Sequence, residues 1–245
     1  MKSQSNHIEL LRDDDNYYGD LGKMYLSNSD IYALLKNPAS YKKHEYSKPM
    51  LEGAYFHTLM LEPDKLDSFE IVDASTRSTK LYKEAIESSD QEILLLGHEA
   101  KAIEDMANKM KSSLDIYEQV YEDGAVYEEP AIKEIYDVMW KGKADVINSS
   151  YVIDLKTTAD ITKFRRSAFA YNYDSQAYLY QQFFGKPVKF IVICKSTGII
   201  KQFECSSEFL ESGRDKVMDA VIAWNRFFGP DATDDPESFV DTEIL

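Results

Sequence analysis

The chain has 245 residues, of which 44% are hydrophobic and 13% aromatic, enough for one well-cored domain with a helical addition. No apolar run approaches the roughly 18 residues of a membrane-spanning helix, and the start MKSQSNHIELLRDDD has no hydrophobic signal segment, so we expect a cytoplasmic protein without membrane contact. The net charge of −15 opposes non-specific binding of nucleic acid but leaves room for a local basic channel.

Cysteine usage excludes one class of cofactor. Cys194 and Cys205 are the only two cysteines, and in a reducing compartment we expect both to be free thiols. Two thiolates are too few for a four-cysteine iron–sulfur cluster, so no cluster of this type is expected.

Clustered acids mark both ends of the chain. Residues 1–24 include Asp13-Asp14-Asp15 and have no sustained apolar period, and residues 230–245 are also acidic. We interpret the first segment as an N-terminal arm that is partly ordered by its aromatic residues, and both acidic stretches as solvated and poorly ordered. Consecutive aspartates point in different directions, so the triple is not a predicted metal site. Residues 25–229 contain no internal repeat or low-complexity linker and are expected to form a single domain.

The N-terminal half of this domain has the pattern of helices with one short strand. Ser27 or Ser29 can cap the first helix, which Asn37-Pro38 ends. The predicted elements are helices over 27–36 and 50–61, a strand-like and then loop-like stretch over 66–79, and two helices within 80–122 that break near Ser88-Ser89.

The C-terminal half alternates strands and helices. The predicted elements are strands over 125–129 and 132–139, a hairpin over 141–158, a helix over 161–184, a second hairpin over 188–194 and 199–205, and a closing helix over 208–228. This order predicts an α/β fold with a central mixed sheet flanked by helices.

The hairpin over 141–158 carries charged residues with a chemical interpretation. Asp154 and Lys156 are two apart in the second strand, so the pleat places both on one face, and Asp145 lies on the first strand near the same turn. Two carboxylates suit Mg²⁺ or Mn²⁺, and an ammonium beside them can orient a bound water and stabilise developing charge. The alternative is an exposed ion pair between Asp154 and Lys156 without a catalytic role, because short motifs also arise by chance.

The register of this hairpin decides whether the two aspartates can share an ion. Asp145 and Asp154 have opposite parity, so a regular ladder places them on one face only if paired residue numbers sum to an odd value. We expect this register, with Asp145 opposite Val152 and Asp154 as its diagonal neighbour, or a bulge with the same effect. A ladder that pairs Asp145 with Ile153 would separate the two carboxylates.

Several motifs in this order resemble those of a known family. They are Ser27-Asn28-Ser29-Asp30-Ile31, Gly53-x-x-x-His57, Glu128-Glu129, GKADVI at 142–147, IDLKTT at 153–158, and SQAYLY at 175–180 with its Gln-x-x-x-Tyr spacing. Together they resemble the PD-(D/E)xK nuclease superfamily, and more narrowly the RecE-type (exonuclease VIII-like) exonucleases of phages and prophages. One departure is Ala144 before the first aspartate, where the superfamily has proline.

The resemblance implies roles for residues near the hairpin. Asp145 and Asp154 would bind Mg²⁺, with Mn²⁺ as a substitute, together with the Leu155 carbonyl. His57 and Glu129 would complete the shell, and Lys156 would position the attacking water. Glu128 and Glu129 point to opposite faces of a strand, so only one can join the site, and the family alignment favours Glu129.

Polar residues on neighbouring helices would contact the substrate or support the site. Gln176 and Tyr180 share a helix face and would hydrogen-bond a phosphate or hold Lys156, although a polar seam between helix and sheet is the alternative. By resemblance, the helix that begins at Ser27 and Ser29 contacts DNA. Lys163, Arg165 and Arg166 can line a basic channel for DNA, and an ordinary solvated surface is the alternative.

The resemblance implies a restriction-endonuclease-like core and a metal-dependent exonuclease of linear double-stranded DNA, acting 5′ to 3′ in phage-type recombination. The resemblance also implies a single-strand annealing protein as a partner and a homo-oligomeric ring as the assembly. The alternatives are a single-strand or structure-specific nuclease on the same core, and a non-catalytic module that binds DNA or protein.

Overall fold

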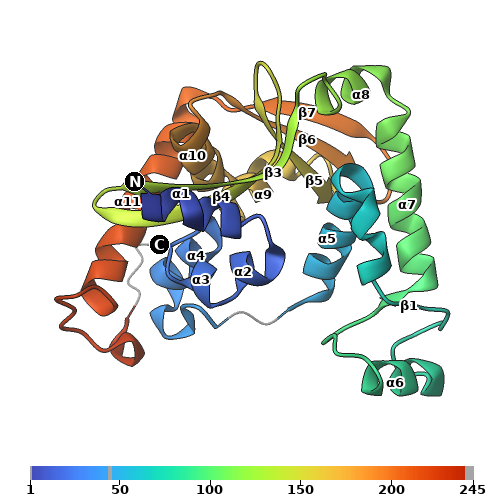
Figure 1. Ribbon diagram of the computed structural model, residues 1–245, viewed down its shortest axis with the longest axis horizontal. Coiled ribbons are helices and arrows are strands. Elements are labelled where there is room, and N and C mark those ends of the chain that lie inside the picture. Colours follow the sequence, from blue (N-terminus) through green and yellow to red (C-terminus); the bar gives the residue numbers. More distant parts are fainter. Residues whose placement is uncertain (1, 44–45, 241–245) are drawn as a thin grey trace.

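The computed structural model describes residues 2–43 and 46–240 (Figure 1). The last five residues of the predicted acidic tail, 241–245, therefore lie outside the described part. Within that part, no helix combines the length and the apolar character needed to cross a membrane.

A five-stranded mixed sheet forms the centre of the molecule, in the order β3-β4-β5-β6-β7. Its strands are β3 (Val126–Ile135), β4 (Val138–Ile147), β5 (Val152–Thr158), β6 (Val188–Cys194) and β7 (Ile200–Glu204). Among the described strands of this sheet, β5 and β6 alone pair in parallel, because the helical segment between them returns the chain to the same end of the sheet. The predicted fold class, a mixed sheet flanked by helices, is confirmed.

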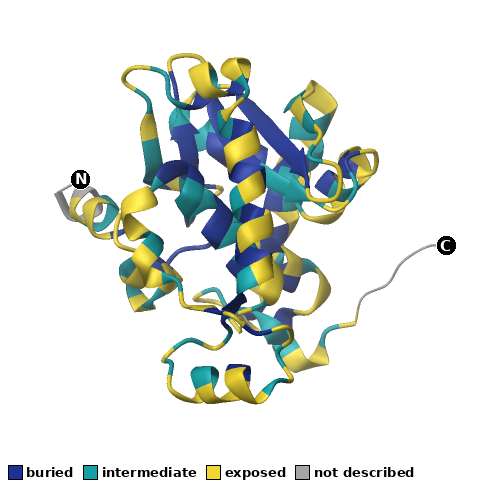
Figure 2. Cartoon of the chain, turned by 90° about the vertical axis from the view of Figure 1, so that its right-hand side faces the viewer, coloured by how far each residue is buried: buried dark blue, intermediate teal, exposed yellow. Residues whose placement is uncertain are grey.

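Helices cover both faces of the sheet. On one face, α5 (Lys48–Leu61), α7 (Gly97–Lys111) and α8 (Leu114–Val120) pack against apolar side chains of β4, β5 and β6. On the other face, α9 (Phe164–Ala170) and α10 (Tyr173–Phe184) pack against the alternate residues. α4 (Asn28–Lys36) and α11 (Ser207–Phe227) join α10 in a further cluster around Trp140. Figure 2 shows the buried strands between these helices.

Part of the predicted second helix within 80–122 is a strand. α6 (Lys80–Glu87) ends where predicted, but β2 (Leu95–Leu96) pairs in parallel with β1 (Ile71–Val72), and the next helix begins only at Gly97. Leu95 and Leu96 are consecutive and both are buried. A short apolar run without alternation cannot be distinguished from part of a buried helix by its spacing alone.

Two other boundaries differ from the prediction. The strand predicted over 132–139 contains a tight turn, since Tyr136 and Asp137 both have positive φ (54° and 60°) and connect β3 to β4. The helix predicted over 161–184 is interrupted at Asn172, which adopts the left-handed conformation. Asparagine and aspartate tolerate this conformation better than most residues.

The N-terminal residues form three helices: α1 (Lys2–Leu10), α2 (Asp14–Tyr18) and α3 (Asp20–Lys23). The interpretation of the aspartate triple as poorly ordered is wrong, because Asp13 caps α2 by accepting a hydrogen bond from the Asn16 backbone N–H. Fully buried Leu11 and nearly buried Tyr17 pack with Ile132 of β3. The blue helices in Figure 1 thus lie against the β3–β4 hairpin.

Candidate metal centre and active site

Three potential metal ligands from three elements converge beside the sheet. His57 of α5, Glu128 of β3 and Asp145 of β4 each offer one ligand atom, and these atoms lie within 4.8 Å of one another. His57 Nδ1 is 3.4 Å from Asp145 Oδ2 and 4.0 Å from Glu128 Oε1. We call these three residues the His–Glu–Asp cluster.

The β4–β5 hairpin brings the second aspartate close to this cluster. Its ladder pairs Val146 with Ile153 and Ile147 with Val152, so the paired numbers sum to an odd value, as predicted. The predicted partner of Asp145 is wrong, because Val152 lies opposite Ile147. The reason is a four-residue loop in which the Asn148 side chain accepts hydrogen bonds from the backbone N–H groups of Ser150 and Tyr151.

The two strands part beyond this short ladder, at the position of Asp145. Ala144 packs on the α10 side of the sheet and Val146 on the α5 side, although they are two residues apart, so strict alternation breaks between them. Asp145 Oδ2 instead accepts a hydrogen bond of 2.7 Å from the Leu155 backbone N–H. The Leu155 carbonyl accepts a hydrogen bond of 2.9 Å from His57 Nε2. One residue of β5 therefore links two members of the cluster.

Glu128, and not Glu129, faces this cluster. The β3–β4 ladder pairs Tyr127 with Val146 and Glu129 with Ala144, which brings Glu128 level with Asp145. Glu128 has φ of +46°, an uncommon conformation for a residue with a side chain. The Glu129 carboxylate is engaged elsewhere, since Arg12 donates two hydrogen bonds to it at 2.7 and 2.8 Å. Glu129, which was expected in the metal shell, therefore lies away from the cluster, and Glu128 takes its place beside His57 and Asp145.

Asp154 is fully buried and held on both sides. Its Oδ2 lies 2.6 Å from Lys156 Nζ, in an ion pair that lacks the angles of a good hydrogen bond. Its Oδ1 accepts a hydrogen bond of 2.8 Å from Gln176 Nε2. Lys156 also lies over the ring of Tyr173, 4.8 Å from its centre. The simple alternative of an exposed ion pair does not describe this burial.

Gln176 and Tyr180 form a chain of hydrogen bonds from α10 to the sheet. Gln176 Nε2 also contacts the Tyr180 hydroxyl at 3.0 Å, and that hydroxyl donates to the Lys143 carbonyl at 2.5 Å. Tyr180 is nearly buried. Gln176 therefore orients the Asp154 carboxylate directly, and Tyr180 contacts Asp154 only through Gln176.

Burial and mutual repulsion make the acids of this site difficult to ionise together. Burial raises the pKa of Glu128 to about 8, and the charge of Asp145 adds to this effect. Burial also raises the pKa of Asp154 to about 6, against the attraction of Lys156. For His57, burial alone would lower the pKa, but Asp145 and Glu128 outweigh it and raise the pKa to about 9. The site therefore favours added positive charge.

The donor set fits a hard divalent cation. Carboxylates and a backbone carbonyl are the oxygen ligands of Mg²⁺ and Mn²⁺, and a single imidazole is compatible with Mn²⁺. His57, Glu128 and Asp145 would hold the ion, with Asp154 and the Leu155 carbonyl on the adjoining strand. The buried Asp154 Oδ2, which has an ion pair but no well-directed hydrogen bond, is a further oxygen suited to a ligand.

The predicted DNA-contacting residues lie outside this centre. The Ser27 hydroxyl donates to Asp30 at 2.8 Å and pairs with the Ser29 hydroxyl, so both serines support the start of α4. Their helix is nevertheless tied to α10, because Asn28 accepts a hydrogen bond from Ser175, the neighbour of Gln176.

The basic residues around α9 are exposed. Lys163 forms an ion pair of 3.3 Å with Asp160, and Arg165 and Arg166 lie on the outer surface of the helix. In the described part of the chain, none of the three has a hydrogen bond or ion pair with the His–Glu–Asp cluster. They do not contribute to the centre itself.

Two residues of the site were not predicted. Glu128 was considered, but its backbone conformation has no signature in the sequence. Tyr173, the first residue of α10, was missed because an aromatic residue in a helix carries no specific signal, and its contact with Lys156 joins residues 17 apart in the chain.

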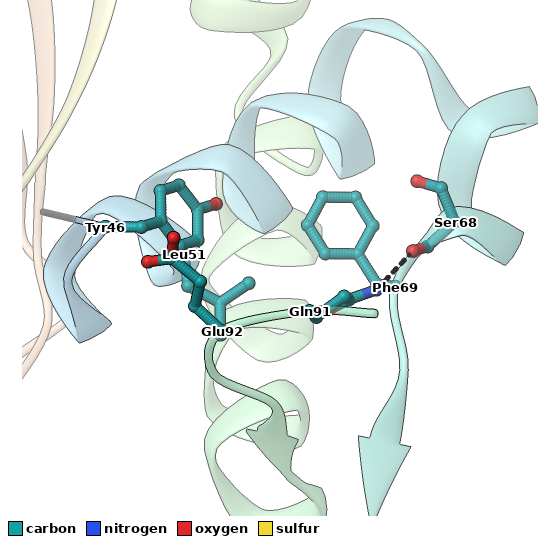
Figure 3. A pocket seen from close by; sticks show the side chains of 6 residues that line it. All are labelled: Tyr46, Leu51, Ser68, Phe69, Gln91 and Glu92. Atoms are coloured by element: carbon teal, nitrogen blue, oxygen red, sulfur yellow. Dashed lines mark hydrogen bonds between the residues drawn. The ribbon is translucent and has the colours of Figure 1, made fainter. Parts of the chain in front are cut away.

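A pocket of about 410 Å³ lies apart from this chemistry (Figure 3). Its lining residues are Tyr46, Leu51, Ser68, Phe69, Gln91 and Glu92. Gln91 crosses it to donate a hydrogen bond of 2.9 Å to the Ser68 carbonyl. No member of the His–Glu–Asp cluster lines this pocket.

Comparisons with known proteins agree with the geometry. The sequence profile of a family described as "PDDEXK-like domain of unknown function (DUF3799)" matches residues 23–226. Among curated proteins, no match to the chain was found. A solved structure from Eubacterium rectale, described as a "putative exonuclease", has a TM-score of 0.65 at 19% identity, covering 87% of this chain and 85% of its own. At that identity the likeness shows a shared fold alone. A second solved structure, SSO0001, has a TM-score of 0.32 at 15% identity, covering 76% of this chain and 84% of its own, too low to support a fold comparison.

Proposed function

The chain belongs to the family of PDDEXK-like domains, and we propose that it is a metal-dependent deoxyribonuclease that degrades linear double-stranded DNA from its ends. The observation that carries this proposal is the meeting of His57, Glu128 and Asp145 beside the buried Asp154–Lys156 pair. Family membership supports a nuclease in general. The preference for duplex ends, the 5′ to 3′ direction and a role in exposing strands for an annealing protein are the finer parts of the proposal.

The residues divide the chemistry of phosphodiester hydrolysis among them. A bound divalent cation would supply an acidified water and offset charge on the phosphorane-like transition state. The Lys156 ammonium, which pairs with Asp154, has further N–H groups that could donate to the attacking water or to a non-bridging oxygen. Gln176 and Tyr180 keep Asp154 in one orientation, which limits the reorganisation needed at the moment of reaction.

The assay for this function compares three DNA substrates in Mg²⁺. We expect a 5′-labelled linear duplex to lose its label early, while a closed circle of the same sequence stays intact and single strands react more slowly. Lys156→Gln should abolish cleavage in a protein that still folds, and it should lower the thermal unfolding midpoint because it removes the counter-charge of the buried Asp154. EDTA should stop the wild-type reaction.

Each other outcome assigns a different function. Cleavage of closed circles would indicate an endonuclease, and faster cleavage of single strands would indicate a single-strand nuclease on the same core. Absence of cleavage of every substrate in both Mg²⁺ and Mn²⁺ would leave only a non-catalytic binding module. Full activity of Lys156→Gln would contradict the mechanism.

A further inference from the structure

The N-terminal segment presents an acidic side chain to lysines next to the candidate centre. Asp14 of α2 forms ion pairs with Lys143 Nζ at 2.6 Å and with Lys65 Nζ at 3.6 Å. These three residues come from α2, β4 and the segment after α5, and the two lysines are 78 positions apart in the chain, so only the fold brings them together.

Lys143 adjoins the His–Glu–Asp cluster. It lies two residues before Asp145 in β4, and it pairs across the ladder with Pro130, two residues after Glu128. Its ammonium is close enough to Glu128 to oppose the burial that raises the pKa of this carboxyl. The Lys143 side chain is only 8% exposed, so Asp14 and the ring of Tyr17, 4.6 Å away, cover it.

Lysine pairs of this kind suit a phosphate. An ammonium binds phosphate as a compact point charge, and phosphate contacts provide most of the sequence-independent affinity of proteins for DNA. A protein with a net charge of −15 depends on such local cations more than a basic protein does. Asp14 is half exposed, so its carboxylate can leave the lysines without opening the core.

We propose that Lys143 and Lys65 form a subsite for a backbone phosphate of the DNA substrate, and that Asp14 occupies this subsite until DNA displaces it. This rests on the proposed function, because it takes the substrate to be DNA bound at the His–Glu–Asp cluster. Asp14 then acts as a competing anion within the chain. Its removal opens Lys143 to the substrate and leaves Lys65 paired with Glu62 at 2.7 Å, from where the Lys65 ammonium can still reach a phosphate.

Matched charge changes in α2 test this subsite. Asp14→Asn and Asp15→Asn each remove one negative charge from adjacent positions, but only Asp14 contacts the lysines, and Asp15 is exposed. The measurement is fluorescence anisotropy of a labelled 20-base-pair duplex, with Ca²⁺ in place of Mg²⁺ and a gel to confirm that the DNA stays intact. We expect Asp14→Asn to lower Kd by about threefold or more, and Asp15→Asn to change it by less than about 1.5-fold.

Lysine variants show whether Asp14 acts through the proposed residues. Lys143→Gln and Lys65→Gln should each raise Kd by about threefold and reduce the dependence of log Kd on log salt by about one. In the double variant Lys143→Gln/Lys65→Gln, adding Asp14→Asn should no longer tighten binding. Lys65 is partly exposed, so Lys65→Gln keeps the test valid if Lys143→Gln fails to fold.

The results separate this inference from the proposed function. Equal Kd values for Asp14→Asn and Asp15→Asn, or tightening by Asp14→Asn that persists without both lysines, would overturn the subsite while leaving nuclease activity intact. Tightening that depends on the lysines, in a protein that cleaves no DNA, would keep the phosphate subsite and reject the nuclease.

Discussion

At the scale of single residues, Glu128 and Glu129 show how backbone conformation decides which of two neighbouring carboxylates reaches the His–Glu–Asp cluster. Both are glutamates in the same strand, yet one faces His57 and Asp145 and the other binds Arg12. The left-handed φ of Glu128 costs on the order of 1–3 kcal/mol for a residue of this kind, and such strain is concentrated at functional sites. We interpret it as the cost of aiming this carboxylate at the cluster.

The two glutamates provide a matched pair of substitutions. Glu128→Gln should raise the Mg²⁺ concentration needed for half-maximal cleavage by about tenfold or more, because it removes a charged oxygen ligand. Glu129→Gln should change it by less than about twofold and lower the free energy of unfolding by at most about 1 kcal/mol, through loss of a surface ion pair. A magnesium titration of cleavage and a urea unfolding curve measure these effects. Equal responses of the two variants would reject the assignment of Glu128.

At the scale of elements, an ionic network around the buried Glu99 joins α5, the loop before α6, and α7. Glu99 at the start of α7 accepts two hydrogen bonds of 2.7 Å from Arg77, and Lys48 of α5 lies 2.7 Å from the same carboxylate. Its backbone partner is the Leu96 N–H of β2. Glu99 therefore holds β2, which the sequence pattern misassigned as helix, against the predicted loop that carries Arg77.

The network predicts a pH-dependent stability. Burial would raise the pKa of Glu99, but Arg77 and Lys48 outweigh it and lower the pKa to about 2, against 4.5 in an unperturbed glutamate. A lowered pKa contributes stability that is complete above pH 4.5 and is lost as the pH falls toward 2. Glu99→Gln should cost about 2–3 kcal/mol of unfolding free energy at neutral pH, and the difference from wild type should shrink below pH 4.5.

Urea unfolding at several pH values measures this effect. Asp105→Asn is the control, because Asp105 forms an exposed ion pair with Lys101 on the same helix and should contribute less than about 1 kcal/mol. A cost of Glu99→Gln that stays constant from neutral pH to pH 2.5 would show that the carboxylate charge is not its source.

At the scale of the whole molecule, the N-terminal helices are part of the folded body. Leu11 is fully buried beside Tyr17 and Ile132. Arg12 donates hydrogen bonds to Glu129, and the ammonium of the buried Lys141 donates to the Tyr17 carbonyl. Burial lowers the pKa of Lys141 to about 8, as expected for an ammonium removed from water. The N-terminal arm, expected to be partly ordered by its aromatic residues, therefore packs on the sheet through Leu11 and Tyr17.

Two adjacent leucines test this integration. Leu11→Ala should lower the unfolding free energy of the whole protein by about 2–4 kcal/mol, because it leaves a cavity under β3. Leu10→Ala, at a position 42% exposed, should cost less than about 1 kcal/mol. Thermal or urea unfolding of both variants provides the comparison. Equally small decreases in unfolding free energy would mean that the N-terminal segment contributes little to the stability of the domain.

The sequence by itself determined the fold class and most strands and helices, because apolar spacing reports which side of an element is buried. It also placed Asp145, Asp154 and Lys156 on one hairpin and required an odd-sum register. Those inferences succeed because they concern residues close together in the chain.

Only the tertiary structure decided which partners complete the site. The choice of Glu128, the approach of His57 from α5 and the contact of Tyr173 with Lys156 depend on packing between elements far apart in sequence. The covering of Lys143 by Asp14 joins residues 129 apart, and the aspartate triple has the local composition of a disordered end. No local pattern reports such meetings, since their energy comes from contacts that exist only once the sheet and its helices have assembled.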